Sequence, residues 1–339
     1  MQRRHDIDAL RAIAFALVIL YHVGMVYVAD WHFHLKSPHA ADWLQLPMRV
    51  LNLWRMDLVF LVSGLALSFA GRGRAGPALL RSRSWRLLLP LAFGMAVVVP
   101  FQPYAQAVAN GTIEPGLLAF LRRYVTGGPW PHDAFDGARP GITWNHLWYL
   151  AYLWVYTAVL VLLLPVLGSR PGMRLRQGFT QLRGARLVLL PLVPLVAASA
   201  LLWPHFPPTR DLLHDGWLHA VYCTLFLYGY TIGADPGWWA EVTRLRWRLL
   251  ALALASLAAH LALRAWLGAT PWRLVPRLAA DAYLWTTLLA ILGWAHHALN
   301  RPWRWLPWAN EAVYPWYVLH QTLIIALVSS QQPSTVPAT

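Results

Sequence analysis

Residues 8–28 read DALRAIAFALVILYHVGMVYV, an apolar run long enough to cross a lipid bilayer as one helix. The run contains two side chains that a bilayer penalises, Arg11 near its start and His22 past its middle. At about 100° per residue, this spacing brings both side chains to within about 20° of one helical face, about 16 Å apart along the axis. Asp8 lies on the same face and is available to pair with Arg11. A functional site and a buried structural pair with a hydrogen-bonded histidine are both compatible with this pattern.

The composition indicates a membrane protein with several spans. The chain has 339 residues, of which 58% are hydrophobic and only 12% charged, whereas soluble domains carry about 25% charged residues. Its single cysteine, Cys223, excludes an intrachain disulfide and a cysteine-based metal cluster. The formal charge of +14 comes mostly from arginines in short segments between apolar runs, which favours a role in membrane topology over nucleic-acid binding.

The apolar runs predict an all-α, polytopic bundle of about nine transmembrane helices. They lie at about residues 9–28, 50–70, 87–108, 147–167, 187–203, 217–233, 248–267, 280–299 and 313–329. Arginines concentrate after the second, fourth, sixth and eighth runs, which places the N-terminus in the cytoplasm. We expect one transmembrane domain over residues 1–330 and a polar C-terminal tail over residues 331–339.

The longest predicted outer loop, residues 109–146, mixes aromatic and polar side chains. Loops of this length are often functional. Its Trp130, His132, Asp133 and Asp136 would suit a carbohydrate, by stacking and hydrogen bonding. An ordinary interfacial loop explains the same composition, so both interpretations stay open.

The first predicted outer loop contains a cluster of histidines and acidic residues, which are His32, His34, His39, Asp30 and Asp42. These residue types can bind zinc, but their spacing matches no clear ligand pattern. We therefore expect solvated interfacial side chains and no metal site.

Two motifs surround the second predicted span. RMDLVFLVSG, residues 55–64, has Asp57 near the outer end and Ser63 inside, where a small residue serves close helix packing or lines a cavity. RSRSWR, residues 81–86, places Arg83 and Arg86 side by side on a helix. Guanidinium groups bind phosphates well, but positive charge on the cytoplasmic side explains the same pair.

The fourth predicted span opens with NHLWYL, which puts His146 near the outer surface and Trp148 and Tyr149 just inside. In a membrane, polar side chains such as these usually face a protein interior or a wet cavity.

The ninth predicted span contains YPWYVLHQT, residues 314–322. Tyr317 and Gln321 share one helical face, and His320 points about 100° away from Gln321 toward another contact. Together with the first and fourth spans, this helix predicts a shared polar cavity.

These motifs resemble the membrane acyltransferases known as acyltransferase family 3. The resemblance rests on DALR with His22 eleven residues after Arg11, and on FLVSG, RSRSWR, HLWYL and YPWYVLHQT in that order. Within the family, the chain is most similar to the branch that succinylates periplasmic glucans. It departs in having Asp57 where that branch often has proline, and in lacking the usual tenth span.

The resemblance implies an integral enzyme of the bacterial inner membrane. It would move an acyl group, succinyl or acetyl, from cytoplasmic acyl-CoA to a hydroxyl of a glucan or other envelope carbohydrate, without a permanent cofactor or metal. His22 would be the general base, with Arg11, Arg83 and Arg86 at the donor phosphates. The residues expected to line the substrate cavity are Asp8, Asp57, Ser63, His146, Trp148, Tyr149, Tyr317, His320 and Gln321.

Other readings remain open at this level. The hydroxyl could attack the thioester directly or through an acyl-histidine. A transporter or flippase for a sugar-containing substrate would use His22 and Arg11 as relay or substrate-binding groups, and a non-catalytic scaffold is the third possibility.

Overall fold

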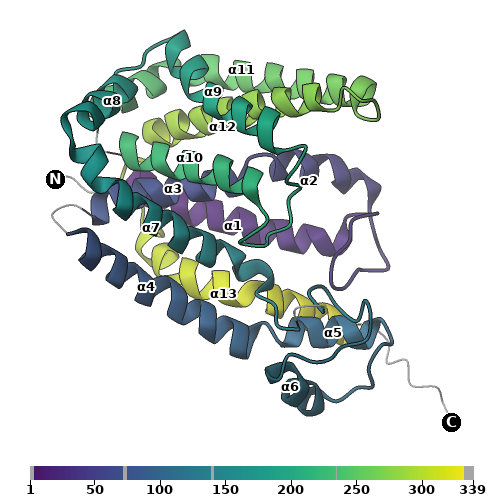
Figure 1. The fold of residues 1–339 in the computed structure, drawn as a ribbon. Helices are drawn as coiled ribbons and strands as arrows, with labels where there is room; N and C mark the ends of the chain where they lie inside the picture. Colours follow the sequence, from purple (N-terminus) through teal and green to yellow (C-terminus); the bar gives the residue numbers. More distant parts are fainter. Residues whose placement is uncertain (1–3, 72–74, 139–140, 234, 332–339) are drawn as a thin grey trace. The chain divides into compact units, whose positions relative to one another are not determined.

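The computed structural model describes residues 4–71, 75–138, 141–233 and 235–331, and this part of the chain contains helices and no strand. The all-α prediction is therefore confirmed (Figure 1). The α-helices are α1 (His5–Tyr27), α2 (Gln45–Asn52), α3 (Arg55–Ala70), α4 (Gly76–Phe93), α5 (Phe101–Ala109), α6 (Leu117–Val125), α7 (Trp148–Gly168), α8 (Arg170–Thr180), α9 (Ala185–Leu202), α10 (Gly216–Ile232), α11 (Pro236–Leu267), α12 (Leu274–Leu299) and α13 (Leu306–Gln331).

Each predicted apolar run coincides with helix. Within the described residues, eight helical segments are long and apolar enough to cross a membrane, which supports a multi-pass membrane protein. The run at 217–233 corresponds to α10, which has 17 residues. The run at 87–108 covers the end of α4, a π-helical stretch at Gly94–Val98, and α5. The predicted tail at 331–339 lies outside the described residues apart from Gln331, the last residue of α13.

One helix begins earlier than the apolar pattern predicts. α11 has 32 residues and starts at Pro236, whereas the apolar run starts at residue 248. The side chain of Asp235 caps this helix by accepting a hydrogen bond from the backbone N–H of Trp238 at 2.8 Å. Proline directly after the cap is also favourable, because the first helical N–H has no intrahelical partner. Arg244 and Arg246, which lie between the predicted runs at 217–233 and 248–267, are therefore within the helix.

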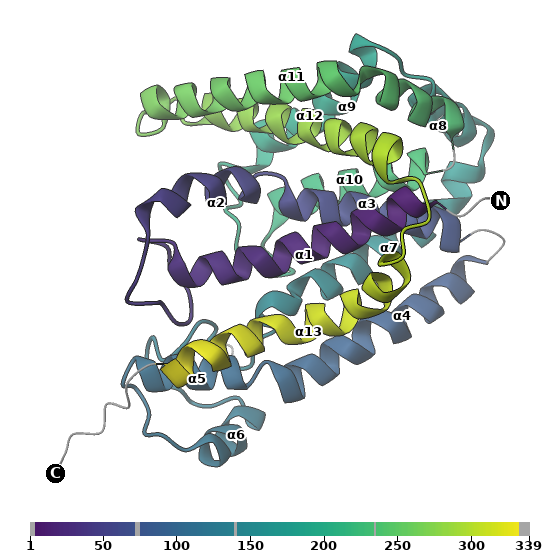
Figure 2. The same cartoon turned by 180° about the vertical axis from the view of Figure 1, so that it is seen from behind.

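The chain divides into two compact units, which are described separately. Unit 1 comprises Met1–Ala14, Leu51–Arg83 and Tyr152–Asn310. In this unit α11 and α12 run side by side as an antiparallel pair (Figures 1 and 2). Gly293 of α12 allows the close approach, because a Cβ there would lie 2.6 Å from the carbonyl oxygen of Val242 in α11.

Two glycines allow α3 and α10 to pack closely in unit 1. A Cβ on Gly64 would lie 1.9 Å from the carbonyl oxygen of Phe226, and a Cβ on Gly229 would lie 2.0 Å from that of Leu61. Small residues facing one another in this way let two membrane helices pack backbone to backbone. The close helix packing that a small residue in RMDLVFLVSG predicts is therefore found at Gly64.

Unit 2 comprises Phe15–Val50, Ser84–Ala151 and Glu311–Thr339. The segment predicted as a long outer loop, 109–146, contains helix α6 and a small core of its own. Phe120 and Tyr124 of α6 bury against Ala107, Ala134 and Phe135. Figure 2 shows α5 and α6 close to the C-terminal end of α13, where Ala105 and Ile325 share a second small core. This segment is therefore a folded part of unit 2, because its aromatic side chains form a small core.

Candidate active site

Three histidines from distant parts of the sequence meet in unit 2. His22 comes from α1, His146 from the 3₁₀ turn before α7, and His320 from α13. The ring centroids of His22 and His146 lie 5.0 and 4.9 Å from that of His320, and His146 and His320 are only 5% and 2% exposed. The structure therefore brings together the polar residues of the first, fourth and ninth predicted spans.

The contacts of His146 determine which of its ring nitrogens carries hydrogen. Its Nε2 lies 3.0 Å from the backbone carbonyl oxygen of Val318, which can only accept. The hydrogen is therefore on Nε2, and Nδ1 accepts from the side-chain amide of Gln102 at 3.4 Å. Both nitrogens of His146 are engaged in holding the surrounding helices together.

The Nδ1 of His22 faces a backbone carbonyl oxygen on its own helix. That nitrogen lies 2.9 Å from the carbonyl oxygen of Val18, one turn earlier on α1, so it donates. In the neutral ring the lone pair is then on Nε2. His22 is partly exposed, unlike the two buried histidines beside it. An imidazole in this form can accept a proton at Nε2.

Aromatic residues form one side of this histidine group. The hydroxyl of Tyr317 donates to the backbone carbonyl of His146 at 2.6 Å. The rings of Phe15 and Tyr149 pack edge-on against Tyr317, with centroids 5.3 and 5.7 Å away. Trp148 and Tyr149, in the first turn of α7, are both buried. These contacts fix the start of α7 against α13 within unit 2.

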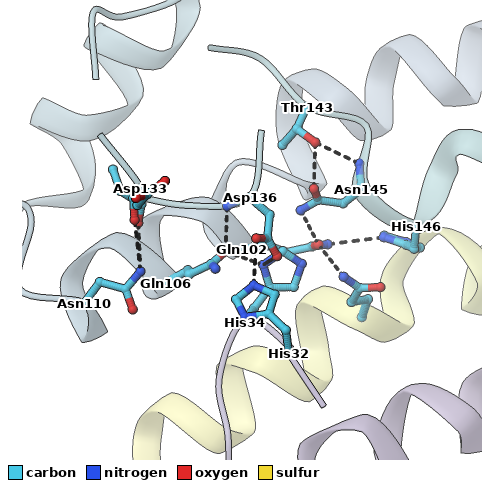
Figure 3. Close-up of polar contacts among 12 residues, drawn as sticks. His32, His34, Gln102, Gln106, Asn110, Asp133, Asp136, Thr143, Asn145 and His146 are labelled. Carbon is cyan, nitrogen blue, oxygen red and sulfur yellow. Dashed lines mark hydrogen bonds and ion pairs between the residues drawn. The ribbon is translucent and has the colours of Figure 1, made fainter. Parts of the chain in front are cut away.

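Gln102 is the central residue of a polar network that the sequence analysis missed. Its side chain is fully buried and accepts from Asn145 Nδ2 at 2.8 Å and from Gln321 Nε2 at 3.0 Å. It donates to Thr322 Oγ1 at 2.7 Å and to His146, and Figure 3 shows Gln102 between Asn145 and His146. The available signal was the pair of glutamines four residues apart in the run at 87–108, Gln102 and Gln106, which share a helical face.

A second polar group ties the first outer loop to the segment 109–146 (Figure 3). His34 Nδ1 lies 2.6 Å from Gln106 Oε1, which also accepts from the backbone N–H of Asp136 at 3.1 Å. On the exposed side, His32 Nε2 lies 2.8 Å from Asp136 Oδ1. Burial lowers the pKa of His34 below its usual 6.5, although the nearby Asp136 carboxylate acts in the opposite direction.

These loop histidines are therefore engaged with Asp136 and Gln106. Asp30 and Asp42, also in the first outer loop, both accept from Gln45. Among the described residues, no group of three or more His, Cys, Asp or Glu side chains is placed to hold a metal ion.

Arg11 lies in unit 1. Its Nη2 donates to Asn310 Oδ1 at 2.5 Å, and its Nε is buried without a hydrogen-bond partner among the described residues. The Asp8–Arg11 pair stays a prediction. At the start of α1, Asp6 accepts from Arg4 and from His296, each at 2.7 Å.

The predicted arginine pair lies on α4, and Asp57 and Ser63 lie on α3. Arg83 and Arg86 lie on α4, one turn apart, and Arg86 is exposed. Asp57 lies in the first turn of α3 in unit 1, where it is 5% exposed, as is Arg55. Ser63 Oγ donates to the carbonyl oxygen of Val59 at 2.7 Å. Asp57 and Ser63 thus belong to unit 1, and the histidine group belongs to unit 2.

The comparisons with known proteins bear on the whole chain. The searches of curated proteins and of solved structures found no match. A family model described as an acyltransferase domain, acyltransferase family 3, matches residues 4–335, nearly the full length. Together with the membrane-spanning helices, this match shows that the chain belongs to acyltransferase family 3 and is a membrane acyltransferase.

Proposed function

We propose that the protein moves an acyl group from acyl-CoA to a hydroxyl of an envelope carbohydrate, with His22 as the general base. The observation that carries this proposal is the state of the His22 ring. Its Nδ1 donates to the Val18 carbonyl oxygen, so that the lone pair of the neutral ring is on Nε2. A hydroxyl needs such a base, because it is a weak nucleophile until its proton is removed.

The proposed reaction is a direct transfer. The acceptor oxygen attacks the thioester carbonyl carbon while its proton passes to His22 Nε2. The tetrahedral intermediate then collapses with loss of the coenzyme A sulfur, and the proton on His22 passes to that sulfur. This sequence forms one C–O bond, breaks one C–S bond and returns His22 to its neutral form.

The donor is proposed to be acyl-CoA because basic side chains suitable for its phosphates occur at two places. Arg11 has a buried Nε without a described partner, and a charged guanidinium atom of this kind is costly unless it meets an anion. Arg83 and Arg86 present two further guanidinium groups from one face of α4. The cytoplasmic location of these residues follows from the arginine distribution.

The acceptor is proposed to be a carbohydrate, with a periplasmic glucan first and succinyl or acetyl as the acyl group. The support is the composition of the segment 109–146, where His132, Asp133 and Asp136 are exposed and Trp130 is partly exposed. Aromatic faces and carboxylates are suitable partners for sugar rings and hydroxyls. The glucan branch and the bacterial inner membrane come from the sequence resemblance.

The test uses the purified full chain in lipid nanodiscs. Radiolabelled succinyl-CoA and acetyl-CoA are supplied with glucan oligosaccharides, and the acylated sugar is detected by chromatography and mass spectrometry. His22→Ala should lower turnover by about 10²–10⁴-fold. His39→Ala is the matched control, because His39 is an exposed histidine of the first outer loop and should keep wild-type turnover.

Two results would count against the proposal. Wild-type turnover in His22→Ala would remove the assigned base. Transport of a glycan across a vesicle membrane without thioester cleavage would favour the transporter instead.

A further inference from the structure

His320 is held on α13 in one protonation pattern. Its Nδ1 lies 3.1 Å from the carbonyl oxygen of Trp316 and 2.8 Å from that of Tyr317. Because carbonyl oxygens only accept, the hydrogen of the neutral ring is on Nδ1, and Nε2 carries the lone pair. The ring is 2% exposed, so that its orientation is set by protein contacts.

The lone pair of His320 is directed at His22. The distance between His320 Nε2 and His22 Nδ1 is 3.2 Å. Two lone pairs at this distance would repel each other, so the hydrogen lies on His22 Nδ1 and is shared between His320 Nε2 and the Val18 carbonyl oxygen. Val18 lies one turn before His22 on the same helix, α1, so its carbonyl is a local acceptor. His320 provides a second acceptor for His22 Nδ1–H from a different helix, α13.

We propose that His320 is a positioning residue for the base, an inference that rests on the proposed function. By accepting from Nδ1–H together with the Val18 carbonyl oxygen, His320 adds to the preference for the lone pair of His22 on Nε2 and restricts rotation of the ring. When His22 takes the acceptor proton, the bond to His320 becomes charge-assisted and stabilises the imidazolium. The arrangement follows the logic of a nucleophile–base–orienter triad, with a neutral imidazole in the place of the usual carboxylate.

His146 does not supply this function. Its Nε2–H donates to Val318 and its Nδ1 accepts from Gln102, so neither nitrogen is directed at His22. The ring of His146 packs edge-on against that of His320, at 4.9 Å between centroids, and thereby supports its orientation.

Two substitutions test the accepting atom of His320, Nε2, separately from its donating atom, Nδ1. His320→Asn keeps an N–H near the Trp316 and Tyr317 carbonyls but removes the acceptor facing His22. His320→Gln is longer, and its amide oxygen can occupy the position of Nε2. We expect His320→Asn to lower kcat about 10–100-fold with little change in the KM for acyl-CoA. His320→Gln should recover most of that loss.

His260→Asn is the matched control. His260 is also a buried histidine on a membrane-spanning helix, 5% exposed, with its Nδ1 2.8 Å from a backbone carbonyl, that of Pro276. It lies in unit 1, and its substitution should leave kcat unchanged.

A spectroscopic readout tests the contact independently of activity. In protein labelled with ¹⁵N-histidine, the His22 signals, identified by their loss in His22→Gln, should show hydrogen on Nδ1. In His320→Asn, which leaves the Val18 carbonyl oxygen but removes the acceptor on α13, the share of the Nδ1–H form should fall, and in His320→Gln it should recover.

The outcomes separate this inference from the proposed function. Unchanged kcat in His320→Asn, or an unchanged share of the Nδ1–H form of His22 in that variant, would overturn the positioning role. If His22→Ala keeps wild-type turnover, the proposed function fails, and the nitrogen spectra still show whether His320 determines the form of His22.

Discussion

At the scale of single residues, the guanidinium of Arg11 has one described hydrogen bond and one buried nitrogen without a described partner. One nitrogen bonds Asn310, and the buried Nε has no described partner. We expect Arg11→Ala to raise the KM for acyl-CoA about tenfold or more, because a charge-assisted contact to phosphate contributes on the order of 1.5–3 kcal/mol. The measurement is steady-state kinetics with a coenzyme A thioester and with a pantetheine thioester, which lacks the phosphates.

The phosphate-free donor provides the control for Arg11. With the pantetheine thioester, Arg11→Ala should leave the KM unchanged. Asn310→Ala removes the contact to Arg11 but keeps the guanidinium, so it should weaken coenzyme A binding less than Arg11→Ala. Equal penalties with both donors would mean that Arg11 supports the fold and not the donor.

His34 links the first outer loop to the segment 109–146 through Gln106 and Asp136. Burial lowers its pKa, so the folded state binds fewer protons than the unfolded state between the folded pKa and 6.5. The stabilisation from this contact is complete above about pH 6.5 and is lost as the pH falls through that window. Below pH 6 we therefore expect lower protection of the backbone amides at residues 32–36, measured by hydrogen-exchange mass spectrometry in nanodiscs and corrected for the intrinsic pH dependence of amide exchange. His34→Gln should remove this loss of protection, and protection factors in the wild-type protein that do not change with pH would contradict the assignment.

At the scale of elements, the contact of α3 with α10 depends on the absence of a side chain. Gly64→Ala would put a methyl group 1.9 Å from the Phe226 carbonyl oxygen, so the two backbones must separate. We expect a loss of about 1–3 kcal/mol, seen as a lower midpoint of thermal unfolding in detergent. Gly178→Ala in α8 is the control, because nothing lies within 4 Å of the added Cβ. Equal midpoints for the two variants would show that the α3–α10 contact is not tight.

At the scale of the whole molecule, the arginine distribution predicts which segments face the cytoplasm. In a Cys223→Ser background, Ala78→Cys and Gln177→Cys should react with an impermeant maleimide only after the cells are opened. Glu114→Cys should react in intact spheroplasts, because residues 109–146 are predicted to lie outside. All three positions are exposed in the structure. Labelling of Ala78→Cys from outside would invert the topology and exclude cytoplasmic donor entry near Arg83.

The sequence by itself determined the class of the molecule and much of its helical layout. Apolar runs of membrane length are a local property, since each helix satisfies its own backbone within four residues. The same local periodicity put Arg11 and His22 on one helix, and the order of the motifs identified the family that the full-length match confirms. The start of α11 was predicted too late because a cap, and not apolarity, decides it.

The tertiary structure decided which polar side chains act together. Gln102 was missed because its partners, Asn145, Gln321 and Thr322, come from segments far away in the sequence. The aromatic core around α6 and the contact of His34 with Gln106 depend in the same way on where the outer segment folds back. The Nδ1 of His22 also lies 3.2 Å from His320 Nε2, almost 300 residues away. A helical pattern shows which side of a helix a residue occupies, but the packing determines which side chains of other helices it meets there.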